Sequence, residues 1–150
     1  MEIRTLKLTD IDLLLPLIDQ LVSANKTLPF RPDYRIAFRD SAKKVLNETD
    51  AVIFIAEAEG EIIGLIAGRI SDNGTIIFPD KIGYIGTLVV LSGHRRKGIA
   101  KALWKKLKEW FLSKGIDEAQ LYVLPDNEEA KSFWKNCGFN IILERWKNHL

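Results

Sequence analysis

A strand, a basic turn and a helix follow one another between residues 83 and 115, and this order restricts the folds available to the chain. Residues 84–91 are apolar and rich in β-branched side chains, which predicts a buried strand. Apolar side chains then recur at helical spacing over residues 99–114, and Gly115 follows as a stop signal. The turn between them, residues 92–98, reads Ser-Gly-His-Arg-Arg-Lys-Gly.

The charges at the start of this helix oppose the usual preference. Helix N-termini favour acidic side chains because the helix dipole is positive there. Here no acid occurs before Glu109, and four cations crowd the helix start: Arg95, Arg96, Lys97 and Lys101. An anion bound on the turn explains this, because free N–H groups would hold it and Gly98 would allow its close approach.

The glycines of the turn fit neither common nucleotide motif. Gly93 and Gly98 have the outer spacing of a P-loop, but Ile99 and Ala100 replace the Lys and Ser/Thr that should follow. A GxGxxG dinucleotide motif is not found after the strand. The remaining pattern, Arg95-x-x-Gly98-x-Ala100, resembles the acyl-CoA pyrophosphate loop of the GNAT superfamily of N-acetyltransferases.

A second pattern follows about one strand later. Residues 127–139 read Asn127-x-x-Ala130-x-x-Phe133-Trp134-x-x-x-Gly138-Phe139 and look like the other GNAT hallmark, Asn-x-x-Ala-x-x-Phe/Leu-Tyr-x-x-x-Gly-Phe. Taken alone, this pattern also suits an ordinary capped amphipathic helix with a glycine stop. Its position after the basic turn favours the family.

The resemblance implies an α/β fold. The expected sheet is GNAT-like, mixed and mostly antiparallel, with about six or seven strands and about four flanking helices. It splays between its fourth and fifth strands, and acyl-CoA lies in the V.

The resemblance also implies an acetyl-CoA site. Backbone groups of the strand would pair with the pantetheine arm, as in β-augmentation, the turn would hold the pyrophosphate, and Asn127 would bind pantetheine. The expected binding residues are Leu88, Val89, Val90, Arg95, Arg96, Lys97, Gly98, Ile99, Ala100, Lys101, Asn127 and Trp134.

The chain departs from the family pattern at the catalytic positions. Trp134 stands where the family has its acidic tyrosine, and an indole N–H is no useful acid near neutral pH. We therefore interpret Trp134 as a wall of the pantetheine tunnel. Tyr84 and Tyr122 are the first catalytic candidates, followed by His94, Asp80, Glu57 or water; a good leaving group such as CoA thiolate also permits transfer without an acid.

The rest of the chain is predicted to alternate strands and helices. The sequence favours strands at 2–8, 51–58, 61–70, 117–124 and 139–146, and helices at 11–22, 33–46 and from 126 to 137. Thr9 or Asp10 would cap the first helix, in which Pro16 fits only in the first turns or at a kink. Ile36 is expected to face inward.

The acceptor site is expected in the stiff loop between the first two helices. Phe30, Arg31 and Tyr34 lie around two prolines there, and substrate contact and ordinary surface packing are equal alternatives for them.

Composition limits the classes of function. We expect a single domain over residues 1–150, located in the cytoplasm, without a signal peptide or a membrane span. Cys137 is the one cysteine and no cluster of metal ligands accompanies it, so neither a disulfide nor a metal site is expected. The expected partners are acetyl-CoA and an amine acceptor, with a second copy of the chain as a candidate and no membrane.

Three functions are compared. The first is acetyl-CoA-dependent N-acetyl transfer to a primary amine by direct attack on the thioester. The second is a catalytically silent acyl-CoA sensor that keeps the binding site. The third, nucleic-acid binding, is disfavoured by the net charge of only +2 and by the apolar stripe on the basic helix.

Overall fold

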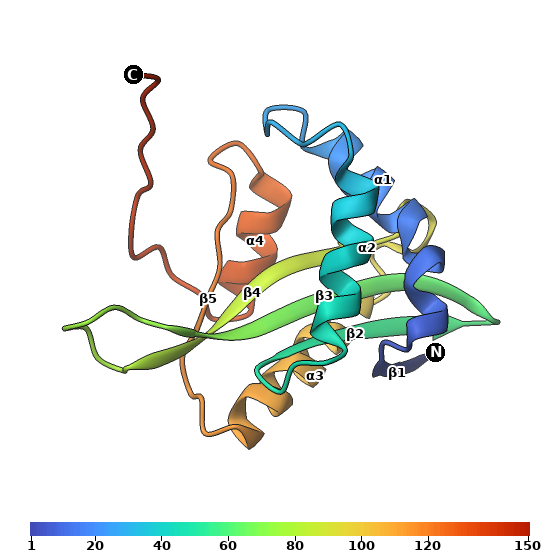
Figure 1. Cartoon of the computed structure of the whole chain (residues 1–150), viewed down its shortest axis with the longest axis horizontal. Coiled ribbons are helices and arrows are strands. Elements are labelled where there is room, and N and C mark those ends of the chain that lie inside the picture. The colour runs from blue at the N-terminus through green and yellow to red at the C-terminus, as the bar shows by residue number, and fades with distance from the viewer.

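A computed structural model describes all of residues 1–150 (Figure 1). The order of its elements is β1 (Glu2–Thr5), the 3-10 helix η1 (Leu8–Leu14), α1 (Leu15–Ala24), α2 (Tyr34–Val45), β2 (Ala51–Ala58), β3 (Glu61–Asp72), β4 (Lys81–Val90), the 3-10 helix η2 (Ser92–His94), α3 (Ile99–Ser113), β5 (Ala119–Gln120) and α4 (Glu128–Asn136). The strands form one sheet in the order β1-β2-β3-β4-β5, antiparallel except for the parallel pair β4 and β5. The predicted mixed, mostly antiparallel α/β architecture with four helices is confirmed.

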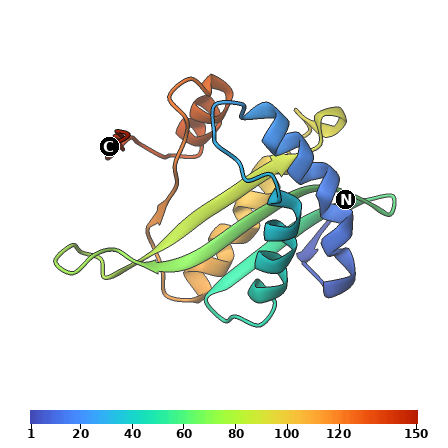
Figure 2. The same ribbon diagram turned by 45° about the horizontal axis from the view of Figure 1, so that its top comes forward.

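Each face of the sheet is covered by helices, as Figure 2 shows. Alternate residues of β2 point to opposite faces. Val52 and Phe54 join one apolar core with residues of α3 and α4, whereas Ile53 and Ile55 join a second core with η1, α1 and α2. The long apolar strands therefore run through the middle of a three-layer molecule.

Helix α3 lies very close to β3 because two glycines face it. A Cβ atom at Gly68 would lie 2.5 Å from Leu107 Cδ1, and one at Gly64 would lie 3.1 Å from Leu103 Cδ1. The two glycines therefore permit a close backbone approach, which fixes the height of α3 over the sheet.

The first helical segment differs from its prediction. It begins as η1, whose N-cap is Lys7, and Asp10 instead accepts the Lys7 N–H with its carboxylate at 2.8 Å. The α-helix starts only at Leu15, so Pro16 occupies the first turn, where its missing N–H costs nothing. The first strand ends at Thr5 rather than at residue 8, because Lys7 and Leu8 already form the start of η1.

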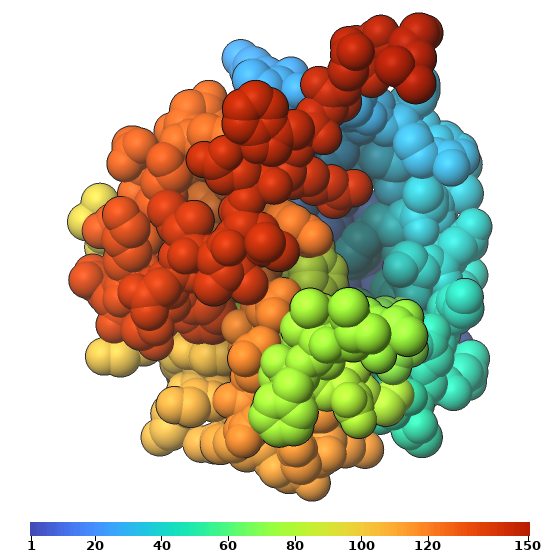
Figure 3. Space-filling model, turned by 90° about the vertical axis from the view of Figure 1, so that its left-hand side faces the viewer, coloured from blue at the N-terminus to red at the C-terminus, as the bar shows by residue number.

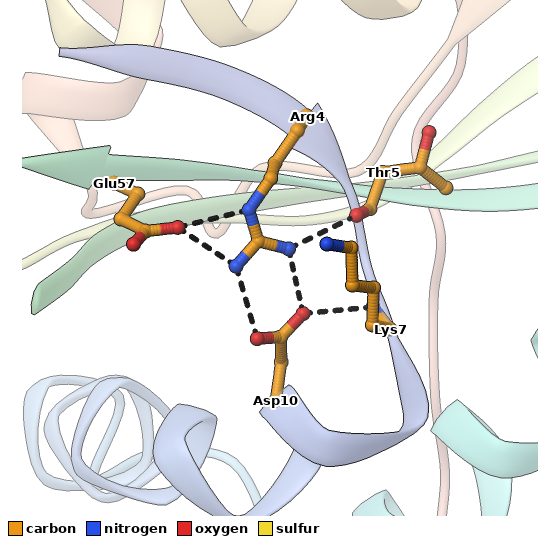
Figure 4. A network of polar contacts seen from close by, with 5 residues as sticks. All are labelled: Arg4, Thr5, Lys7, Asp10 and Glu57. Atoms are coloured by element: carbon orange, nitrogen blue, oxygen red, sulfur yellow. Dashed lines mark hydrogen bonds and ion pairs between the residues drawn. The ribbon is translucent and has the colours of Figure 1, made fainter. Parts of the chain in front are cut away.

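A buried ion cluster joins β1, η1 and β2 (Figure 4). Arg4 donates to both carboxylate oxygens of Asp10, at 2.7 and 3.0 Å, and its Nε donates to Glu57 at 2.8 Å. The Asp10 side chain is only 8% exposed, and the hydrogen bonds from Arg4 hold the pKa of its carboxyl below its usual range. Glu57, one of the catalytic candidates, is therefore part of a structural ion pair.

The sheet has five strands, fewer than the expected six or seven. The strand predicted over 117–124 is reduced to Ala119 and Gln120, and that predicted over 139–146 does not form. A strand needs a neighbour for its backbone groups, and the short β5 offers almost no edge beside which residues 139–146 could pair. This segment extends from the body of the molecule (Figure 1), with Ile141, Leu143 and Trp146 at least 77% exposed.

The inward orientation predicted for Ile36 was also wrong. Ile36 is 59% exposed, because the inward stripe of α2 consists of Tyr34, Phe38, Ala42 and Val45. None of the helices is long and apolar enough to cross a membrane.

Candidate active site

The second half of β4 has an open edge. Leu91 N donates to Ile63 O of β3, and alternation along an antiparallel ladder turns the backbone groups of Leu88 and Val90 to the opposite edge. On that edge β5 pairs with β4 only as far as Tyr84. Beyond this residue the two strands part, so the N–H and C=O groups of Leu88 and the N–H of Val90 face a gap.

A bulge sets this orientation. Ala67 pairs with Thr87 and Gly68 pairs with Ile85, so Gly86 is an extra residue in β4. One extra residue reverses the alternation of the strand beyond it. Gly86 thus contributes backbone geometry to β4 and no side chain.

The turn after β4 presents a row of free backbone donors. Arg96 and Gly98 have positive φ angles of 63° and 78°, and helix α3 begins directly after Gly98. The N–H groups of Arg96 to Lys101 donate to no carbonyl of the turn or the helix cap, and no side chain caps α3. Alternating left- and right-handed residues ahead of a helix start form a concave cradle for an anion.

Cations surround this cradle. Arg95, Arg96, Lys97 and Lys101 are all exposed, and the first turn of α3 contains no acid. One acid approaches from α4, where Glu129 lies 3.8 Å from Arg95 with its side chain 64% exposed. Such a long, solvated pair binds weakly. The predicted anion site therefore has both the donors and the charge that it requires.

Asn127 caps helix α4 as predicted, and its Oδ1 accepts the Ala130 N–H at 3.0 Å. Its Nδ2 donates to no protein group and is left for a carbonyl of a ligand.

Trp134 is 7% exposed and lies in an aromatic cluster. Its ring makes edge contacts with Phe133, Trp104 and Phe139, at centroid distances of 4.9, 5.7 and 5.0 Å. Most of the indole thus packs in the core between α3 and α4. The indole N–H has no protein partner, yet it is not among the fully buried polar atoms, so it reaches the surface.

The two catalytic candidates of the strands lie together. The rings of Tyr84 and Tyr122 meet edge to face at 5.9 Å, at the point where β4 and β5 part. Burial raises the pKa of Tyr84 above its usual value, and the nearby Tyr122 raises it further. Tyr84 therefore keeps its proton throughout the neutral range. Arg145 of the C-terminal segment lies over the Tyr122 ring at 5.4 Å.

Comparison with known proteins identifies the family. Residues 16–139 match the model of the acetyltransferase (GNAT) family. The chain belongs to the GNAT acetyltransferase family. It is 31% identical over 149 residues to an N-alpha-acetyltransferase of Sulfurisphaera tokodaii, covering 93% of this chain and 80% of that protein.

Solved structures agree on the fold. The aminoglycoside N-acetyltransferase AAC(6')-Iy in complex with CoA superposes with a TM-score of 0.84 at 22% identity, covering 99% of this chain and 93% of that one. The same enzyme with the bisubstrate analogue CoA-S-monomethyl-acetylneamine gives a TM-score of 0.76 at 25% identity, with 98% of both chains covered. The family match and the 31% identical relative together show that this GNAT protein is an N-acetyltransferase.

The predicted acceptor residues of this GNAT protein are occupied by neighbouring acids. Arg31 binds Asp33 at 2.8 and 2.9 Å, and the Tyr34 hydroxyl donates to Asp19 at 2.7 Å. Arg35 also binds Asp19, and its hydrogen bonds lower the pKa of that carboxyl to about 2. The bonds from Tyr34 and Arg35 to Asp19 fix the start of α2 against α1.

A hollow lies between the N-terminal helices and the C-terminal part of the GNAT fold, as Figure 3 shows. A pocket of about 320 Å³ is lined by Asn73, Ile77, Phe78, Glu118, Gln120, Ile142 and Leu143. Another groove, of about 570 Å³, lies elsewhere, between the C-terminal parts of α2 and α3 and the start of β2. We place the chemistry at the β4 edge because the free backbone donors converge there.

Sequence reasoning missed one residue at this site. Gln20 of α1 bonds to Val90 and Ser92 at the end of β4. A single glutamine on an amphipathic helix gives no local signal of such a contact.

Proposed function

We propose that the chain transfers an acetyl group from acetyl-CoA to a primary amine that attacks the thioester directly. The observation that carries this proposal is the continuous run of unpartnered backbone groups from the β4 edge to the start of α3. The donors of Arg96 to Lys101 suit a pyrophosphate, and the cations around them balance its charge. Leu88 and Val90 suit the amides of the pantetheine arm, which would pair as an added strand.

This placement fixes the direction of the acyl group. With the pyrophosphate at the turn, the arm runs back along β4 toward the point where the strands meet. The reactive end then comes to Tyr84 and Tyr122. In the reaction, the amine nitrogen bonds to the acyl carbon, the C–S bond breaks, and the proton lost by the amine is balanced by one gained by the thiolate. Leu88 N–H is the nearest backbone donor for the charge on the acyl oxygen.

Tyr84 and water divide the proton chemistry. Tyr84 stays protonated in the neutral range, so it is able to donate a proton to the thiolate but is unable to act as the base. Water in the hollow of Figure 3 takes the amine proton. Asn127 Nδ2 and the Trp134 N–H, both without protein partners, complete the wall on the α4 side.

The amine enters from the hollow on the side of α1 and α2. The relatives suggest two acceptor classes, since one is an N-alpha-acetyltransferase and another is an aminoglycoside N-acetyltransferase. We favour a primary amine carried on a peptide, because the more similar relative acts in that class.

The test is turnover with saturating acetyl-CoA and a panel of amines, read as release of free thiol. The panel holds peptides with free N-termini, peptides with an internal lysine, an aminoglycoside and a polyamine. We expect thiol release with the N-terminal peptides and a loss of it in Gly98→Val. CoA binding without thiol release from any amine would contradict the proposal and favour the silent sensor.

A further inference from the structure

A side-chain clamp holds the end of β4. Gln20 Nε2 donates to Val90 O at 2.9 Å, and Ser92 N donates to Gln20 Oε1 at 2.9 Å. The residues are 70 and 72 positions apart in the sequence. Both bonds come from one amide of α1, which crosses the C-terminal end of β4 in Figure 2.

This amide acts as a substitute for a neighbouring strand. In a sheet, the C=O of one residue and the N–H of the residue two positions later point to the same edge and pair with one neighbour. Gln20 supplies a donor and an acceptor to these two groups on the open edge of β4. It therefore occupies the last pairing position of that edge.

The clamp also limits the number of β4 backbone groups to which a ligand is able to bond. Leu88 keeps both backbone groups free and Val90 keeps its N–H, whereas the Val90 C=O is already bonded. An arm lying along β4 meets three free groups and then the Gln20 amide. Ser92, the other end of the clamp, opens the turn that contains the anion cradle.

We propose that Gln20 is a positioning residue of the acyl-transfer site, which fixes the β4 edge and the cofactor turn relative to each other. This inference rests on the proposed function. Gln20 does not touch the reacting atoms; it acts through Val90 and Ser92. Because Gln20 belongs to α1, it also joins the end of β4 to a helix that borders the proposed acceptor side.

The test compares Gln20→Leu with Ser23→Leu, which places leucine at an exposed position of the same helix. Binding of CoA is measured by calorimetry, and exchange of the Ser92 amide hydrogen by NMR. For Gln20→Leu we expect an affinity about tenfold weaker, the effect of about one lost hydrogen bond, and faster exchange at Ser92. Ser23→Leu should change neither.

A second variant separates positioning from folding. Gln20→Glu keeps an acceptor for the Ser92 N–H but, when ionised, loses the donor to the Val90 C=O. We expect Ser92 to stay protected while the affinity for CoA falls and the KM for acetyl-CoA rises more than kcat changes. If Gln20→Leu fails to fold, the CoA affinity and the KM of Gln20→Glu alone test the positioning role.

The inference is overturned if the Gln20 variants keep the wild-type CoA affinity and the wild-type exchange rate at Ser92. A different result, wild-type protein that binds no CoA, would refute the proposed function itself.

Discussion

Trp134 shows how one residue combines packing with a place at the site. Its ring packs in the core between α3 and α4, and its N–H has no protein partner. An indole has no proton that titrates near neutral pH, so we expect it to form a wall rather than to act as an acid.

The variant Trp134→Phe tests this role, because it keeps an aromatic ring and removes the N–H. We expect kcat to fall about tenfold at most, the effect of one weak donor of about 1.4 kcal/mol. The measurement is kcat against pH, with Trp110→Phe, on the distant half of α3, as the control. A loss of several hundredfold, or a missing basic limb, would show that the indole or its bound water transfers a proton.

Asp10 is a structural residue whose charge stabilises the fold. Because its pKa is lower in the folded chain than in the unfolded one, its contribution is present above about pH 4 and is lost as the pH falls below that value. Asp10→Asn should lower the free energy of unfolding at pH 7 by about 2–3 kcal/mol, less than for a fully buried pair because Arg4 keeps Glu57.

Urea denaturation of the wild type and of Asp10→Asn, at pH 7 and at pH 3, tests this prediction. The difference between them should shrink at pH 3, because the carboxyl of the unfolded chain gains its proton at a higher pH than that of the folded chain. Asp12→Asn, which breaks an exposed pair with Arg39, is the control. An equal cost at both pH values would show that the charge of Asp10 contributes little.

Among the elements, α3 contributes most to the site, and its sequence shows why. The cations at its start and the place of Gly98 in the turn were both visible in the sequence, because helix capping and dipole effects depend on residues a few positions apart. The left-handed conformation of Gly98 came only with the structure. The Gly86 bulge and the Gln20 clamp were not predictable in this way. Both depend on which residues of β3 and α1 come to lie beside β4, which is a property of the whole sheet.

A pair of glycines at the two ends of α3 gives a matched experiment. Gly98 and Gly115 both have φ of 78°, and neither would bring a Cβ within 4 Å of another group. Gly98→Val and Gly115→Val should therefore cost the same backbone strain, about 1–3 kcal/mol of stability.

The two variants should differ in cofactor binding. Gly98→Val places a side chain in the anion cradle, and loss of one charge-assisted phosphate contact weakens binding by about 1.5–3 kcal/mol. Gly115→Val should bind CoA as the wild type does. Equal CoA affinity of both variants in calorimetry would place the pyrophosphate elsewhere.

At the scale of the whole molecule, the C-terminal part shows where prediction from sequence ends. Residues 139–146 have the composition of a strand, but whether a strand forms depends on a partner edge. Large apolar side chains are exposed both on the β3–β4 hairpin and in the C-terminal part: Ile76 and Phe78 of the hairpin are 93% and 91% exposed, and Trp146 is 86% exposed. Exposed apolar patches of this kind are typical of protein interfaces.

We expect a homodimer in which this surface meets that of a second copy, with residues 139–146 pairing along a strand edge. Sedimentation of the full chain should show a dimer that dissociates on dilution. The double variant Phe78→Ser, Trp146→Ser should remain a monomer, whereas Ile36→Ser, at an exposed position of α2, should not. A wild-type chain that is monomeric at every concentration would contradict this.

The central claim is that CoA lies along the β4 edge with its pyrophosphate on the start of α3. The most direct measurement is a titration of ¹⁵N-labelled chain with CoA, followed by the backbone amide signals in NMR spectra. We predict that the largest shifts occur at Leu88 and Val90 and at residues 96–101. Unchanged signals at these amides, or shifts centred on Val52 and Trp110 in the groove between α2 and α3, would contradict the claim.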